Sequence, residues 1–127
     1  FFFNSIFSRI SSMLLGIVKQ LLALDIDVNA RYANDLTLLM WAAGPDEAVA
    51  EAQALEVVSY LLDAGARVDE RDARGRTALM IAAEGNHPAI AKALLAHGAD
   101  AALADKAGKH AADLTILSAL RAELTPR

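Results

Sequence analysis

Cysteine, an excess of basic charge and long apolar runs are all missing from this 127-residue sequence. Without cysteine, disulfide bonds and thiolate chemistry are excluded, although the cellular compartment stays open. The formal net charge of -4 at pH 7 gives no support to nucleic-acid binding, which usually comes with a basic domain. The apolar stretch from Met13 to Val18 is far too short to cross a bilayer, so no transmembrane segment is predicted.

Motifs that carry catalysis or bind cofactors are missing as well. The sequence contains no glycine-rich phosphate loop, no His-Glu-x-x-His and no nucleophile elbow. Its three histidines, His87, His97 and His110, fall at different positions of the repeat described below, so stacking would not gather them. We therefore predict that the protein is not an enzyme and has no cofactor and no metal site.

What the sequence does contain is a hydrophobic fraction of 55%, made largely of alanine and leucine, with few aromatic residues. This composition suits a single domain of helices that pack closely through small side chains.

Internal repeats organise the sequence. The segment "DAGA" at 63–66 recurs as "AHGA" at 96–99, a step of 33 residues that also separates Gly75 from Gly108. An earlier copy, residues 37–43, matches residues 77–83 at a step of 40. About seven extra residues must therefore lie between positions 43 and 56 of the earlier copy.

Each repeat unit is predicted to form two short helices. Asp72 and Gly75 favour a turn, because Asp can bond its own downstream backbone and Gly adopts a positive φ. Thr77 is a good N-cap for a first helix, and Pro88 fits the first turn of a second helix. Gly98 ends that second helix as a left-handed cap. Helices this short are not stable alone, so neighbouring units must stack and share one core.

The order Gly-x-Thr-x-Leu, then Ala-Ala, then a helix that ends in Leu-Leu-x-x-Gly-Ala-Asp resembles the ankyrin repeat. Residues 75–100, "GRTALMIAAEGNHPAIAKALLAHGAD", carry the pattern almost in full, and the resemblance covers about residues 17–116. The motif is specific, because repeats of tetratricopeptide type lack its turn and its exit. The resemblance implies an all-α, ankyrin-type solenoid of stacked helix-turn-helix units joined by β-hairpin-like turns.

By similarity, residues 1–127 form a single ankyrin repeat domain of four units. The predicted units are 4–31 (degenerate and N-terminal), 32–71 (with the insertion), 72–104 (full) and 105–127 (the C-terminal capping repeat). Asp25 stands where the family has its capping glycine, Asp35 replaces the turn glycine of the second unit, and His110 replaces threonine in the fourth. Irregular end units are expected, because a terminal repeat must present one face to water.

The insertion in the second unit begins with Pro45-Asp46-Glu47, which has the composition of a helix start with acids at the positive end of the dipole. Apolar residues at 48, 49, 52 and 55 then fit a helical stripe. We predict that the second helix of this unit is extended at its N-terminus by one to two turns. The alternative is a floppy acidic loop.

The resemblance also implies a binding surface, since ankyrin-like proteins hold partners in a concave groove made by hairpin tips and the exposed side of the first helices. The candidate partner-binding residues are Arg31, Asn34, Leu36, Arg71, Arg74, Arg76, Glu84, Lys106 and Lys109. Met40, Met80 and Asp113 are expected at further groove positions of the first helices.

Six of these residues form a predicted basic row on a negatively charged protein: Arg31, Arg71, Arg74, Arg76, Lys106 and Lys109. One hypothesis is that the groove favours an acidic segment of a partner protein. The alternative is an ordinary solvated face that Glu70, Asp72 and Asp105 neutralise. Arg71, Arg74 and Arg76 are expected to have no role in the repeat itself, so they are the first residues to test.

The N-terminus begins "FFFNSIF" and has no initiator Met, so we expect a processed or truncated product. Apolar residues at three-four spacing predict a helix over residues 4–24 that packs on the next unit as a cap. Phe1, Phe2, Phe3 and Phe7 form a second candidate interface, which could serve a partner, self-association or a membrane surface.

We therefore predict a non-catalytic protein-protein interaction module, an adaptor, scaffold or inhibitor whose partner is another protein. The alternative is a small structural subunit that docks through its Phe-rich N-terminal helix onto a larger assembly or a membrane surface. The sequence does not determine the compartment: a soluble cytoplasmic protein is the default, and a processed periplasmic or secreted form stays open.

Overall fold

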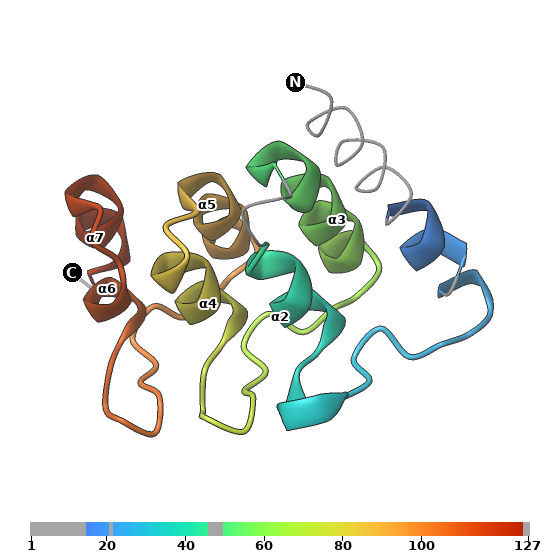
Figure 1. Ribbon diagram of the computed structural model, residues 1–127, viewed down its shortest axis with the longest axis horizontal. Helices are drawn as coiled ribbons and strands as arrows, with labels where there is room; N and C mark the ends of the chain where they lie inside the picture. The colour runs from blue at the N-terminus through green and yellow to red at the C-terminus, as the bar shows by residue number, and fades with distance from the viewer. Residues whose placement is uncertain (1–14, 21, 46–49, 126–127) are drawn as a thin grey trace.

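The computed structural model describes residues 15–20, 22–45 and 50–125, and its helices form two layers (Figure 1). One row contains the short helices α2 (Leu38–Ala43), α4 (Ala78–Glu84) and α6 (Ala111–Leu114). The other contains α3 (Glu51–Asp63), α5 (Pro88–Ala96) and α7 (Ser118–Leu124). Each short helix packs against the helix that follows it and against its neighbours in the same row, which confirms the predicted all-α solenoid.

Threonine begins the first helix in two units. Thr37 Oγ1 accepts a hydrogen bond from the amide of Met40, and Thr77 Oγ1 accepts one from the amide of Met80, both at 3.3 Å. Each bond satisfies an amide that the first turn of a helix leaves without a partner. The predicted N-cap at Thr77 is confirmed, and Thr37 does the same one unit earlier.

Left-handed residues end the second helices at the predicted positions. Gly65 has a φ of 97° and Gly98 has a φ of 89°. Asp25, at the same position of the first unit, has a φ of 62°, and Asp35 in place of the turn glycine has a φ of 60°. Residues other than glycine are strained in this region, although Asp tolerates it better than most. Both aspartates thus keep the glycine backbone of the repeat at some loss of stability.

The insertion lengthens α3, which has 13 residues whereas α5 has nine. Both helices end two residues before a left-handed glycine, so the four additional residues lie at the N-terminus of α3 and add about one turn. The predicted start at Pro45 is wrong, because Pro45 is not helical and α3 begins at Glu51. Residues 46–49 lie outside the described residues.

The acidic residue in the first turn of α3 is therefore Glu51, and it has a tertiary partner. Its Oε1 accepts a hydrogen bond from the amide of Ala89, at 3.0 Å, in the first turn of α5. The extra turn of α3 thus caps the corresponding helix of the next unit, a contact that local helix preferences do not show.

The core lies between the two layers and is made of aliphatic side chains, of which Leu61, Leu79 and Ile90 are at most 1% exposed. Met40 and Met80 belong to this core, with exposed fractions of 2% and 1%, so the expectation that they line the groove is wrong. Successive helical side chains are rotated by about 100°, and on α2 the rotation that buries Met40 leaves the next residue, Trp41, 62% exposed.

The fourth unit keeps the backbone path but changes its contacts. His110, in place of threonine, donates its amide to Asp113 Oδ2 at 2.9 Å. α6 has only four residues, and Thr115 follows it in an extended conformation. The buried Thr115 hydroxyl donates to Asn86 Oδ1 of the third unit at 2.9 Å, which ties the last unit to its neighbour.

Candidate partner-binding surface

Three hairpin tips lie side by side along one edge of the domain (Figure 1). We name them tip A (32–36, which includes the short helix η1, Ala33–Asp35), tip B (72–76) and tip C (105–109). In tip B, Asp72 N donates to Arg76 O at 3.0 Å, and Gly75 N donates to Asp72 O at 2.9 Å. The same pair of backbone bonds closes tips A and C, although tip A differs in its left-handed Asn34.

Backbone hydrogen bonds also join neighbouring tips. Ala73 N donates to Asn34 O at 2.9 Å, and Lys106 N donates to Arg74 O at 3.1 Å. Glycine at position 75 leaves room for the second contact, since a Cβ at this position would lie 3.0 Å from Lys106 N. The tips therefore form one continuous strip, in which these backbone bonds hold the side chains of neighbouring tips at a set spacing.

The turn acids are engaged by the backbone of their own tips, as predicted. Asp72 Oδ1 accepts from the amides of Arg74 and Arg76 at 2.9 and 2.8 Å. Asp105 Oδ1 accepts from the amides two and four residues later, both at 2.9 Å. The hydrogen bond from the Lys109 amide lowers the pKa of Asp105 below 3.8, and the Ala107 amide and the charges of Arg76 and Lys109 act in the same direction against partial desolvation.

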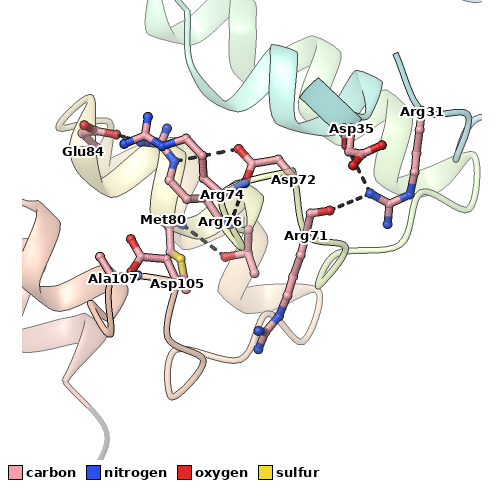
Figure 2. A network of polar contacts seen from close by, with 11 residues as sticks. Arg31, Asp35, Arg71, Asp72, Arg74, Arg76, Met80, Glu84, Asp105 and Ala107 are labelled. Carbon is pink, nitrogen blue, oxygen red and sulfur yellow. Dashed lines mark hydrogen bonds and ion pairs between the residues drawn. The ribbon is translucent and has the colours of Figure 1, made fainter. Parts of the chain in front are cut away.

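Arg31 does not extend freely from tip A (Figure 2). Its Nη1 donates to the carbonyl oxygen of Arg71 at 2.6 Å and to that of Asp35 at 3.2 Å. Its Nη2 forms an ion pair with Glu70. The side chain thus ties the end of the first unit to the end of the second, and much of its hydrogen-bonding capacity is already used.

Arg76 is also engaged inside the repeat, so the expectation that it has no role there is wrong. Its guanidinium pairs with Glu84 at the end of α4, and its Nε lies 4.0 Å from Asp72 Oδ2 (Figure 2). Only 14% of the Arg76 side chain is exposed. The reason is geometric: Arg76 precedes α4 and Glu84 ends it, so the long side chain reaches along the helix to the carboxylate.

Four cations remain exposed on tips B and C and on the residue before tip B. They form what we call the tip patch: Arg71, Arg74, Lys106 and Lys109. Within the described part of the chain, none of these four side chains forms an ion pair. The guanidinium of Arg71 points away from Arg31 and Asp72 (Figure 2).

The other predicted site residues differ in how far they are exposed to solvent. Asn34 is exposed and has a φ of 61°, while Leu36 is partly buried against the core. Glu84 is half exposed and paired with Arg76. The second candidate interface, Phe1, Phe2, Phe3 and Phe7, lies outside the described residues.

An apolar pocket on the first-helix side was not predicted from the sequence. It has a volume of about 420 Å³ and is lined by Val18, Tyr32, Leu38, Trp41, Ala42, Val57 and Leu61. Trp41 is 62% exposed and Tyr32 is 45% exposed. The feature of the sequence that could have indicated this pocket is the bulky Trp41, which the repeat alignment places at the position of Ile81 in the next unit.

Comparison with known families agrees with this architecture. A family model described as ankyrin repeats matches residues 10–105 in three copies. The chain belongs to the ankyrin repeat family. Ankyrin repeats are generally protein-protein interaction modules and are typically non-catalytic. A comparison with curated proteins finds no match.

Over residues 15–20, 22–45 and 50–125, no helix is both long and apolar enough to cross a membrane. Over the same residues, no three His, Asp or Glu side chains are grouped so that they could hold a metal ion.

Proposed function

We propose that this ankyrin repeat protein is an adaptor, scaffold or inhibitor that captures a partner protein through the tip patch. The patch would contact an acidic segment of that partner. The observation that carries the proposal is the imbalance of charge at tips B and C: the cations of the patch are exposed and unpaired among the described residues, whereas the nearby carboxylates are engaged.

The engaged carboxylates support the first of the two hypotheses for the basic row, the one in which it binds an acidic segment. Glu70 pairs with Arg31 and Arg67, and Asp72 is held by two amides and by Arg76. Asp105 accepts two amides of its own tip. These acids neutralise structural cations and backbone dipoles, so the tip patch keeps its positive charge on a protein whose net charge is -4.

The spacing of the patch is held by the fold. Arg74 and Lys106 sit on adjacent tips that the bond between Lys106 N and Arg74 O joins. Exposed charges of this kind add little affinity each, but together they steer a complementary partner and set the register of the complex. The two arginines can also bind carboxylates in a bidentate geometry.

The test compares two triple variants that change the net charge equally. The patch variant carries Arg74→Gln, Lys106→Gln and Lys109→Gln. The matched control carries Lys19→Gln, Arg67→Gln and Lys92→Gln, which remove three exposed cations that lie away from tips B and C. Each immobilised protein is exposed to the same cell extract, and the captured proteins are quantified by mass spectrometry at low and high salt.

We expect the proteins captured by the wild type to be retained by the control and lost from the patch variant. Capture by the wild type and by the control should weaken as the salt concentration rises, because salt screens exposed charges. The melting temperature of the patch variant should stay close to that of the wild type, since its three side chains form no ion pair among the described residues. The control loses the exposed pairs of Arg67 and Lys92 and the contact of Lys19 with the Tyr60 ring, which contribute little to stability, so its melting temperature should change only slightly. Equal capture by the two variants at low salt would refute the proposed surface.

A further inference from the structure

Tip A carries a charge of the opposite sign to the tip patch, although it belongs to the same strip. Asp35 is exposed on this tip, and the other residues of tip A are uncharged. Within the part of the chain that the structure describes, the Asp35 carboxylate forms no ion pair and no hydrogen bond. The negative charge of Asp35 is therefore available to a partner.

Arg31, the residue before tip A, does not neutralise this charge. Its guanidinium pairs with Glu70. Its contact with residue 35 is made to the backbone, because Nη1 donates to the carbonyl oxygen of Asp35 at 3.2 Å (Figure 2). Arg31 and Glu70 thus balance each other, and Asp35 leaves tip A with a negative charge.

The turn of tip A does not need the Asp35 carboxylate. In tips B and C, Asp72 and Asp105 each hold two amides of their own tip, but they stand at the position that Tyr32 occupies in tip A. Asp35 stands instead at the position of Gly75. Its φ of 60° suits glycine or asparagine at least as well as aspartate, so the backbone gives no reason for a charge.

Backbone hydrogen bonds between the tips fix the order of the charges along the strip. Asn34 O, in the residue before Asp35, accepts from Ala73 N at 2.9 Å. Arg74 O accepts from Lys106 N at 3.1 Å. The negative charge of tip A is therefore followed by the positive charges of tip B and then by those of tip C.

The same bonds give the spacing of these charges. Hydrogen-bonded neighbouring segments lie about 4.8 Å apart, and the strip alternates a bond within a tip with a bond between tips. Successive tips therefore follow one another at about 10 Å. An extended chain rises about 3.3 Å per residue, so about three residues of a bound segment would span the distance from one tip to the next.

We propose that the partner segment has charges of both signs in a fixed order: acidic residues over tips B and C, and a basic residue over Asp35, about three residues from the nearest acid. Asp35 thereby sets the direction in which the segment lies. The reverse direction would bring acidic groups to Asp35 and the basic group to Lys106 and Lys109, and like charges repel. This inference rests on the proposed function and adds a specificity-determining residue to it.

The test uses two rhodamine-labelled peptides of equal length with blocked termini. Both carry glutamates in one half, and the residue at the opposite end is lysine in one peptide and glutamine in the other. Dissociation constants are measured by fluorescence anisotropy at low salt for the wild type and for Asp35→Asn. The matched control is Asp25→Asn, because Asp25 is also exposed and left-handed, with a φ of 62°, but follows the helix of the first unit. The patch variant described above is measured as well.

We expect the affinity ratio of the lysine peptide to the glutamine peptide to fall by about two- to fivefold in Asp35→Asn, which is the effect of one exposed charge pair in water. Asp25→Asn should keep the wild-type ratio. An unchanged ratio in Asp35→Asn would overturn the inference, and so would an equal fall in Asp25→Asn, because net charge alone would then explain it.

The patch variant separates this inference from the proposed function. If both peptides bind the wild type and lose affinity for the patch variant, an unchanged ratio in Asp35→Asn refutes only the direction. If neither peptide binds the wild type, or if the patch variant binds both with wild-type affinity, the tip patch itself is refuted and the inference with it.

Discussion

Gly75 and Gly108 offer a matched pair of substitutions that measures the contact between tips B and C. Both glycines are left-handed, with φ of 77° and 80°. A Cβ on Gly75 would lie 3.0 Å from Lys106 N, whereas a Cβ on Gly108 would meet nothing within 4 Å. The two alanine variants therefore share the backbone strain and differ in the clash between tips.

The strain of a left-handed alanine destabilises each variant by about 1 kcal/mol. The reduced freedom of the unfolded chain offsets part of this in both variants equally. In Gly75→Ala the clash involves a backbone atom that no side-chain rotation can move. The hydrogen bond from Lys106 N to Arg74 O must then lengthen, and its loss adds about 1 kcal/mol.

Urea unfolding followed by circular dichroism measures both variants. We expect Gly75→Ala to lower the free energy of unfolding by about 1 kcal/mol more than Gly108→Ala, through a lower midpoint at similar slope. The packing argument fails if the two variants lose the same stability. In that case the tips would be independent loops, and the spacing of the tip patch would not be held by the fold.

Three further predictions concern single side chains. Arg76→Gln should lower the free energy of unfolding by about 1 kcal/mol or more, while Arg74→Gln should change it by less than about 0.5 kcal/mol in the same urea titration. Because the folded pKa of Asp105 lies below 3.8, its carboxylate stabilises the fold above the unfolded pKa, and this is lost as pH falls through the folded pKa. Melting temperatures of wild type and Asp105→Asn should therefore converge below about pH 4. Asp25→Gly should raise stability by about 0.5 kcal/mol, since glycine is unstrained at this φ; no gain in the urea midpoint would contradict it.

Much of the fold was predictable because each unit repeats a local signal. Thr77 caps a helix and Gly98 ends one through contacts within a few residues, which a sequence shows directly. The length of α3 was also predictable to within a turn. The start of α3 was not predictable, because the preference of Pro45 and its acidic neighbours for a helix N-terminus is weak. Glu51, in the first turn of α3, instead accepts a hydrogen bond from the amide of Ala89 in α5.

The candidate site was predictable only as a set of positions. The alignment placed six cations at or near the tips, and charge alone could not distinguish among them. Arg31 and Arg76 proved to be tied to carboxylates, and Arg31 also binds the carbonyl of Arg71, 40 residues later. The phase of the short first helices was also beyond the alignment, which is why Met40 was expected in the groove and lies in the core.

The sequence by itself determined the repeat, its period, its turns and its caps, because these depend on residues near one another in the chain. The tertiary structure decided which of the cations stay exposed and which side chains of α2 are buried. Both depend on the stacking of units, because stacking brings residues some 40 positions apart in the chain within bonding distance.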